Sequence, residues 1–494
     1  MNFGTGAAIP EYQDINFKFN VPTEKAGKFT LWGLGGVSAI DFSYEPEEEN
    51  LFAEVGVIQE SQYTGSTGMV GFSHLYFFNE RTSSKLSVTA SGTQNTFGVQ
   101  EAEVIDSPFE EVYAQDSYQN KIGVNWTLKS KLNARNKVKT GFILDAYDIN
   151  LKDSVLADDD IWYRQLDFKG NALLYRGFAS WQHRFNDKWR INTGVHASYF
   201  ALNETTAIEP RINLAFKKST RSTFAIGYGL HSQLQPLPVY FSSDRDASAE
   251  QMQANRDLDF SKSNHAVISW DYSLTPDSRL KLEAYYQQLF NVAVDPLEPE
   301  FSMLNFGADF GFPNQLGLVN DGVGSNMGME VTWERFLKKG FYYLVTASVF
   351  DSKYEGFDKE ERNTFFNSNY VVNALAGKEI NINESLALTF DAKVSVSGGR
   401  RYTPIDLEAS IAAGEEVLDV SRTYEEQHDT YIRPDIKIGL RKNGKRISQT
   451  FFVDMQNFIG RQNVFARTYN AQTEQIQTTF QRGFFPDVRY QILF

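Results

Sequence analysis

The connectors between the extended segments of this chain alternate between short and long from one end to the other. Short connectors include 185–189, 217–221, 275–278 and 441–445, and long ones include 100–117, 152–169, 233–260, 293–324, 355–369 and 398–431. Up-and-down barrels that span an outer membrane have this rhythm, with short periplasmic turns and long extracellular loops. A soluble sandwich has no reason to sort its loops by length onto one face. The pattern therefore predicts an all-β fold, a large antiparallel transmembrane β-barrel.

Within the extended segments, apolar and polar residues alternate with a period of two. In 386–397, Phe390 and Val394 belong to an apolar face, and Asp391 and Lys393 lie on the opposite face. The same alternation marks 121–129, 190–199, 265–274 and 279–287. Full charges are too costly to place in a dry core. Lipid outside a closed barrel and water inside it satisfy both faces, and closure pairs the backbone groups that a bilayer cannot hydrate.

Counting these segments predicts about nineteen strands, within the range known for membrane barrels. They begin near residues 12, 27, 68, 85, 118, 136, 170, 189, 207, 222, 261, 279, 325, 340, 370, 386, 432, 447 and 484. An antiparallel ring with an odd number of strands contains one parallel pair. We therefore expect the strand near Tyr12 and the strand ending at Phe494 to be unpaired or paired in parallel, and we interpret leading strands as missing. Residues 1–494 are predicted to form one barrel domain.

The composition argues against several functional classes. The chain has no Cys, so disulfides, Cys-ligated zinc and a thiol nucleophile are excluded. Its formal charge of −14 argues against nucleic-acid binding. The six His are dispersed without HExxH spacing, and no GxSxG elbow occurs. We expect no enzyme activity, no metal site and no cofactor. Aromatic residues make up 14% of the chain, which suits the aromatic girdles of a membrane barrel.

Individual stretches carry further expectations. Met1–Pro10 lacks the basic and apolar regions of a signal peptide, so we expect a fragment or a gene model that starts late. The acidic runs Glu45–Glu49 and Asp158–Asp160 are expected to be solvated loop charge and not a metal site. By parity, His196 and His265 are expected to face the lumen. No run of 18 apolar residues occurs, so no transmembrane helix is expected.

Several stretches resemble a known family. They are Gly227–Phe241 (GYGLHSQLQPLPVYF), Phe301–Phe312 (FSMLNFGADFGF), Gly398–Pro404 (GGRRYTP), Phe451–Phe465 (FFVDMQNFIGRQNVF) and the opening stretch Gly6–Ala39. Over essentially its whole length the chain resembles the C-terminal barrel of TonB-dependent receptors of the cell outer membrane. The resemblance implies a barrel of 22 strands around an N-terminal plug. It also implies that the plug, the TonB box and roughly the first three strands are absent from this chain.

The same resemblance implies a function and partners. We expect the barrel of an importer of a scarce nutrient, with siderophore, cobalamin, oligosaccharide and peptide all open. The implied partners are outer-membrane lipids, the TonB complex through the missing plug, a small nutrient ligand and a possible surface lipoprotein, and no nucleic acid. The alternative is a passive porin or a structural outer-membrane barrel. An outer-membrane enzyme would need a nucleophile and base cluster that the sequence does not contain.

The last segment has its own pattern. Val488, Tyr490, Ile492 and Phe494 share an apolar face, and the chain stops at Phe494. A terminal amphipathic strand that ends in an aromatic residue resembles the signal read by the barrel assembly machinery. We therefore predict Phe494 as an assembly signal and that machinery as a partner. The alternative is an ordinary edge strand, which is normally short, charged or covered.

The predicted ligand-binding residues lie where strands run into long connectors. They are Gln233, Gln235, Arg400, Arg401 and Tyr402. If the C-terminus is periplasmic, these residues lie near the extracellular mouth. Arginine beside aromatic residues suits an anionic or ring-bearing ligand. The alternative is loop packing and rim salt bridges, since most loop residues carry no function.

Overall fold

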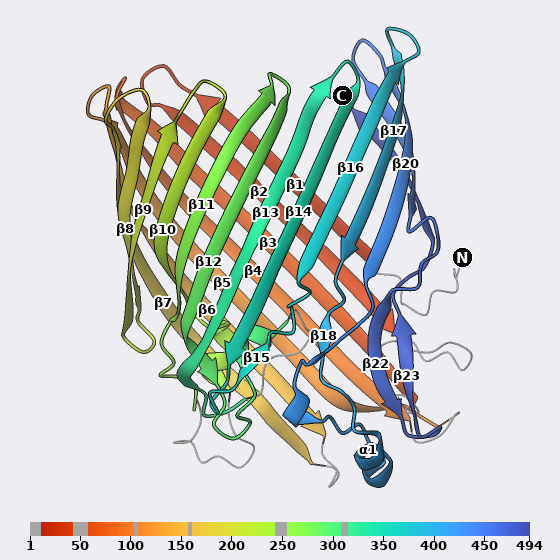
Figure 1. The fold of residues 1–494 in the computed structure, drawn as a ribbon. Helices are drawn as coiled ribbons and strands as arrows, with labels where there is room; N and C mark the ends of the chain where they lie inside the picture. The colour runs from red at the N-terminus through yellow and green to blue at the C-terminus, as the bar shows by residue number, and fades with distance from the viewer. Residues whose placement is uncertain (1–10, 43–57, 103–106, 157–160, 243–253, 308–314) are drawn as a thin grey trace.

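One antiparallel sheet curves round a central lumen and forms the wall of the molecule (Figure 1). The computed structural model describes residues 11–42, 58–102, 107–156, 161–242, 254–307 and 315–494. The strands of the wall are β1 (Glu11–Pro22), β2 (Lys28–Phe42), β3 (Ile58–Asn79), β4 (Thr82–Ala102), β5 (Glu110–Lys131), β6 (Asn136–Leu156), β7 (Trp162–Arg184), β8 (Trp189–Phe200), β9 (Thr205–Lys217), β10 (Ser222–Gln233), β11 (Ser261–Thr275), β12 (Ser278–Val294), β13 (Val319–Lys338), β14 (Phe341–Glu355), β16 (Tyr370–Asn381), β17 (Leu386–Ser397), β20 (Tyr431–Asn443), β21 (Ser448–Gln456) and β24 (Phe485–Leu493).

The predicted fold class and strand number are confirmed. In the described ranges the main sheet has 20 strands. The short β15 (Glu361–Asn363) pairs only with β14, so the other nineteen build the wall. Each strand of the wall pairs antiparallel with its neighbour along the chain, as in an up-and-down barrel. The acidic runs Glu45–Glu49 and Asp158–Asp160 lie outside the described residues.

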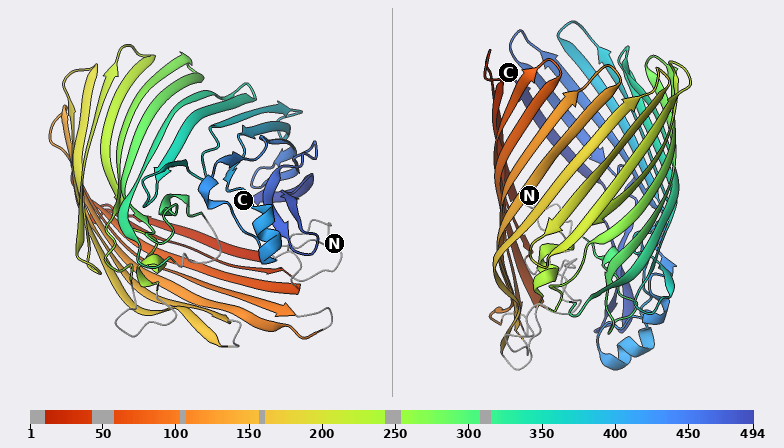
Figure 2. Two further views of the ribbon diagram at one scale, coloured as in Figure 1. Left: turned by 60° about the horizontal axis from the view of Figure 1, so that its bottom comes forward. Right: turned by 90° about the vertical axis from the view of Figure 1, so that its left-hand side faces the viewer.

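Short turns gather at one end of the barrel, the turn end, and the longer connectors gather at the other, the loop end (Figures 1 and 2). The connector 201–204 is short although it lies at the loop end. The elements within the connectors are η1 (Leu237–Phe241), η2 (Met303–Asn305), β18 (Arg401–Tyr402), α1 (Leu407–Ala413), η3 (Val420–Arg422), β19 (Glu426–Gln427), β22 (Val464–Asn470) and β23 (Gln475–Phe480). Within the described ranges, no helix has the length and apolar character needed to cross a bilayer.

The ladder register gives the wall an apolar outer face. Ile226, Ile268, Ala284 and Met329 are successive partners across β10, β11, β12 and β13. Ile226, Ile268 and Met329 are more than half exposed, which is costly for large apolar side chains unless lipid covers them. The residues next to them in sequence, such as Glu283, alternate to the lumen. We call the outward apolar residues of the wall the apolar belt.

Tryptophans mark the turn-end border of the belt. The indole N–H of Trp126 donates to Ser84 Oγ at 2.9 Å, and that of Trp270 donates to Ser222 Oγ at 3.0 Å. An apolar ring with a satisfied polar edge suits the border between lipid and water. His74 belongs to the same border: its Nε2 lies 2.7 Å from the carbonyl oxygen of Ala26 in the first turn.

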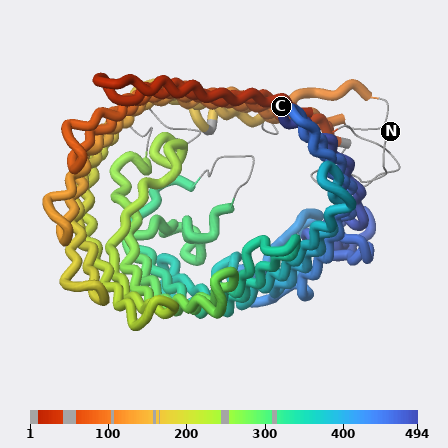
Figure 3. Tube along the Cα trace, turned by 90° about the horizontal axis from the view of Figure 1, so that it is seen from above, coloured from red at the N-terminus to blue at the C-terminus, as the bar shows by residue number. Residues whose placement is uncertain are grey.

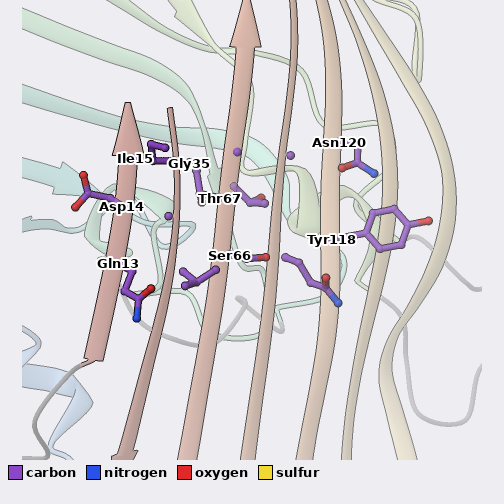
Figure 4. A pocket seen from close by; sticks show the side chains of 14 residues that line it. Gln13, Asp14, Ile15, Gly35, Ser66, Thr67, Tyr118 and Asn120 are labelled. Carbon is purple, nitrogen blue, oxygen red and sulfur yellow. The ribbon is translucent and has the colours of Figure 1, made fainter. Parts of the chain in front are cut away.

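A shallow hollow of about 700 Å³ crosses the outer face of β1–β5 at the loop-end border of the belt (Figure 4). Gly35, Gly68 and Gly92 are register partners, and their missing side chains open its floor. Val70 lies on the turn side of this row, whereas Gln94 lies on the loop side. The change from apolar to polar across the row places the border there.

Two predicted connectors are shorter than expected, because strands β3–β7 are longer than the sequence indicated. The strand predicted from residue 68 begins at Ile58, and the predicted loop 100–117 contains the end of β4 and the start of β5. About 9–11 residues suffice to cross a membrane as a tilted strand, and β3 has 22. The additional residues are polar on both faces, for example Ser61 on one face and Gln62 and Thr64 on the other, so they lack the alternation that predicted strands elsewhere.

As predicted, no antiparallel ladder joins the two end strands of the sheet within the described residues. Within the described residues, β1 pairs with β2 and β24 pairs with β21. Both run from the loop end to the turn end, so a direct ladder between them would be parallel. Gly33, on the lipid-facing side of β2, accommodates Phe17 of β1: a Cβ there would lie 2.7 Å from the Phe17 ring.

A dry cluster occupies part of the lumen near the loop end, which corrects the prediction of a uniformly wet interior. The connector after β10 folds inward, as Figure 3 shows. Val239, Tyr240 and Phe241 of η1 are buried against inward residues of β6 and β7 such as Ile149. Phe241 stacks on Phe168 with ring centroids 3.6 Å apart. Because β6 and β7 carry apolar residues on both faces, the sequence does not indicate which face contacts lipid and which contacts a connector.

Candidate ligand-binding site at the loop end

Arg400 links three connectors at the loop end. Its Nη2 donates to the carbonyl oxygen of Phe465 at 2.6 Å. The guanidinium carbon lies 5.6 Å from the centre of the Phe365 ring and 5.4 Å from that of Phe465. Arg400 nevertheless stays exposed. A cation held between two aromatic faces keeps its remaining donors available to an anion or a ring.

Tyr402 and His428 form the second half of this cluster. Their rings stack with centroids 4.3 Å apart at 11°. The pairing of β18 with β19 continues to His428, whose backbone N–H donates to the Arg400 carbonyl at 3.0 Å. Nη1 of Arg467, in β22, donates to the Tyr402 hydroxyl at 2.6 Å. We call Phe365, Arg400, Tyr402, His428, Phe465 and Arg467 the arginine–aromatic cluster.

The cluster is electropositive. Burial, together with the charges of Arg467 and Arg400, lowers the pKa of His428 to about 4, although Asp429 opposes this shift. His428 is therefore neutral near pH 7, and the two arginines supply the positive charge. Both guanidiniums are exposed. Neither forms an ion pair within the part of the chain that the structure describes. An anion at this surface meets two cations and flat aromatic faces.

Arg401, in contrast, is used within the protein. Its Nε donates to the carbonyl oxygen of Asn367 at 3.2 Å, and its Nη2 donates to Asn369 Oδ1 at 3.0 Å. Its Nη1 donates to the carbonyl oxygen of Glu425 at 2.8 Å. The side chain thus holds 364–369 against the connector after β17. This geometry favours loop packing for Arg401.

Gln233 and Gln235 lie elsewhere on the loop end, after β10. Gln235 is buried, its Nε2 donates to Ser261 Oγ at 2.8 Å, and its backbone N–H donates to the Tyr240 hydroxyl at 3.2 Å. It therefore anchors the inward-folded connector. Gln233 is exposed at the end of β10. Within the described residues, no hydrogen bond or ring contact joins this pair to the arginine–aromatic cluster.

Comparison with solved structures identifies the fold. The chain is similar to the ferric-catecholate import receptor Fiu of E. coli K12, with a TM-score of 0.69 and 11% identity over 99% of this chain and 76% of that one. It is similar to the ferric preacinetobactin receptor BauA of Acinetobacter baumannii (0.65, 11%, 98% and 72%) and the ferric yersiniabactin uptake receptor FyuA of Yersinia pestis (0.66, 11%, 98% and 71%). No protein-family model matches the sequence, and no curated protein does.

The chain has the fold of a TonB-dependent receptor barrel. Arg400, Arg401 and Tyr402 of this barrel were predicted from sequence, and the structure places Arg400 and Tyr402 in one cluster. The sequence did not predict four members of the cluster, Phe365, His428, Phe465 and Arg467. They come from three different connectors, so no spacing along the chain connects them.

The inner wall of the barrel also holds a buried polar network near the loop end. Glu209 is 2% exposed, and it accepts from Arg211 at 2.8 Å and pairs with His196 Nδ1 at 2.7 Å. The Ser232 backbone N–H donates to its other oxygen at 2.7 Å. His196 therefore faces the lumen, as parity predicted. Within the described residues, no group of three or more His, Cys, Asp or Glu side chains is placed to hold a metal ion.

Proposed function

We propose that the chain is the wall of an outer-membrane importer that uses TonB-derived energy to take up a scarce nutrient. The observation that carries the proposal is the receptor-barrel fold over 98–99% of this chain, shared with one protein named as an import receptor and another named as an uptake receptor. The apolar belt is consistent with this proposal because such a surface needs lipid around it. The lumen is consistent with it because it leaves a path for a solute through the barrel. The loop end would then be extracellular.

The arginine–aromatic cluster is our proposed contact for the ligand. Its two exposed guanidiniums favour anionic groups, and the faces of Tyr402 and Phe465 favour rings. Among the nutrients left open by the sequence, an anionic ferric chelate with aromatic arms fits this chemistry best. Gln233, exposed at the same end, is proposed as an additional polar contact. We assign Arg401 and Gln235 to loop packing.

Equilibrium binding to the purified full chain in detergent tests the site. A ferric tris-catecholate complex, followed by quenching of protein fluorescence, is expected to bind wild type. Arg400→Ala and Tyr402→Ala should each weaken binding about tenfold, since each removes a charge-assisted or aromatic contact. The matched control is Arg422→Ala, which removes a loop arginine that pairs with Glu425 and Glu426 outside the cluster. Equal losses in all three variants would contradict the assigned site.

Uptake by intact cells tests the importer itself. Labelled ferric chelate should accumulate in cells that produce the protein, and a protonophore should abolish accumulation because the transport is energised. Uptake that survives the protonophore and rises linearly with concentration would identify a passive porin instead. Binding and uptake are separate measurements, so a wrong ligand site and a wrong function give different results.

A further inference from the structure

The inner wall at the turn end of β1–β6 carries a tract of cations with no acidic partner. We call it the basic tract: Lys18, Lys28, Arg81, Lys85, Lys129, Lys131, Lys137 and Lys139. These side chains line two hollows of about 480 Å³ and 380 Å³, and neither lining includes an acidic residue. Within the described residues, none of these cations lies within ion-pair distance of a carboxylate. In a chain of net charge −14, such a surface is unexpected.

The register concentrates this charge. Lys129 of β5 lies directly opposite Lys139 of β6, and Lys131 lies opposite Lys137. All four line the same hollow. Like charges directly opposite one another on neighbouring strands destabilise a sheet. A bound negative charge would relieve this repulsion at both pairs, and none of the four lysines has a carboxylate of the wall within ion-pair distance.

The other side of the lumen lacks this arrangement. There Lys393 of β17 lies opposite Asp435 of β20, and Asp391 lies opposite Lys437. Arg441 Nη2 lies 2.6 Å from Glu379 Oε1. Inward charges on that wall therefore lie opposite charges of the other sign, and Arg441 forms an ion pair within the sheet. The excess of positive charge is a local property of β1–β6 and is not shared by the whole lumen.

Neutral donors complete the hollow around the facing lysines. Ser83, Ser180, Gln182 and Asn192 line it together with the cations. A third lumen hollow, of about 420 Å³, shares Lys139, Ser180 and Asn192 and extends the polar surface towards β9. Hydroxyl and amide groups beside ammonium groups match the several acceptor oxygens of phosphate or carboxylate groups. The size of these hollows is that of small-molecule sites.

We propose that the basic tract binds small polyanions that carry phosphate or carboxylate groups, with Lys129, Lys131, Lys137 and Lys139 at its centre. The bound oxygens neutralise the facing ammonium groups, which removes the repulsion and supplies the binding energy. The site lies at the turn end, whereas the arginine–aromatic cluster lies at the loop end. The proposal therefore stands apart from the nutrient proposed above.

Titration calorimetry of the purified full chain in detergent tests the proposal, with sodium pyrophosphate and citrate as probes. Binding of at least one probe is expected at low salt and should weaken at high salt, because screening acts on exposed charges. Binding of pyrophosphate alone assigns the site to phosphate groups, and binding of both probes assigns it to either group. No binding by either overturns the proposal.

Variants locate the site. Lys129→Gln with Lys139→Gln should weaken probe binding about tenfold or more, since the two replacements remove two charge-assisted contacts to the anion. Lys129→Glu places a carboxylate opposite Lys139, so the wall should stay folded while binding is lost. Lys393→Gln, on the opposite wall, is the control and should leave binding unchanged. Unchanged affinity in the double variant, or tighter binding of an oligoglutamate peptide than of pyrophosphate, would show the proposal to be wrong.

Discussion

Lys129 and Lys139 lie directly opposite each other on neighbouring strands with both side chains inside the barrel. Alternation in 121–129 by itself places Lys129 on a solvated face, where its replacement would be nearly silent. The facing pair gives a different expectation. Without added anion at low salt, Lys139→Gln should raise the free energy of unfolding by about 0.2–1 kcal/mol, because a like-charge pair is removed. Unfolding titrations in lipid, repeated at high salt, measure this gain, which should shrink as screening increases.

The control for this gain is Lys393→Gln, since Lys393 faces Asp435 across the ladder. That variant should leave stability unchanged or lower it slightly. If both variants change stability by the same amount, the repulsion between Lys129 and Lys139 is not the cause.

Alternation by itself places Asp391 on a wet face, where replacement by Ala would be nearly silent, but the structure gives this carboxylate a partner. The Tyr342 hydroxyl donates to Asp391 Oδ1 at 2.5 Å. Asp391→Ala should therefore cost about 0.5–1.5 kcal/mol, the net contribution of one hydrogen bond. Refolding titrations of Asp391→Ala, Tyr342→Phe and the double variant measure it. Additive costs in the double variant would contradict a direct interaction.

The apolar belt predicts that the stability cost of an introduced arginine depends on its depth in the bilayer. Ile268 is 56% exposed on the outer face between the two borders, so Ile268→Arg should cost about 2–4 kcal/mol, as for arginine at the bilayer midplane. Trp126 lies at the turn-end border, where arginine costs about 0–1 kcal/mol. Ser269→Arg points to the lumen and should be tolerated. Refolding into lipid vesicles measures all three, and equal costs for Ile268→Arg and Ser269→Arg would refute the assigned faces.

The sequence predicted the wall well because each strand there has one lipid face and one wet face. Phe390 and Asp391 lie on the faces that alternation assigned to them, and all nineteen predicted strands are present. The same reasoning failed where a strand has two similar faces. Ser61 and Gln62, on opposite faces of β3, are both polar beyond the belt, and Ile149 of β6 is apolar on the lumen side because a connector covers it. Neither surface produces a period of two.

The candidate sites were harder to predict for a different reason. Arg400 and Tyr402 stood out because they are neighbours, whereas His428 and Arg467 reach the same cluster from distant parts of the chain. The pairing of Lys129 with Lys139 depends on the register between β5 and β6, which the turn 132–135 sets. Lysines in an alternating segment predict that one face of the strand is wet. They do not predict which residue of the neighbouring strand lies opposite each lysine.

His428 predicts a pH dependence at the loop end. Its pKa is lowered in the folded protein, from 6.5 to about 4, so the unfolded connector binds the proton more readily. The stabilisation that neutral His428 gives is therefore complete above pH 6.5 and is lost as the pH falls towards 4. Hydrogen exchange of the amides in 398–430, corrected for intrinsic rates, should show opening over this window. His428→Phe keeps the stack on Tyr402 without a titrating group, and an unchanged pH profile in this variant would assign the effect to nearby carboxylates.

Replacement of Phe494 is expected to impair assembly in cells without lowering the stability of the folded barrel. The residue is fully exposed after the end of β24, so Phe494→Ser should leave unfolding of the refolded barrel within about 0.5 kcal/mol of wild type. In cells the same variant should yield less assembled barrel, measured as the heat-modifiable fraction on gels, if the assembly machinery reads the terminal aromatic. Phe484→Ser, an exposed phenylalanine at the loop end, is the matched control. Equal losses in cells and in refolding would mean that Phe494 supports the barrel itself, because an assembly signal acts only where the machinery is present.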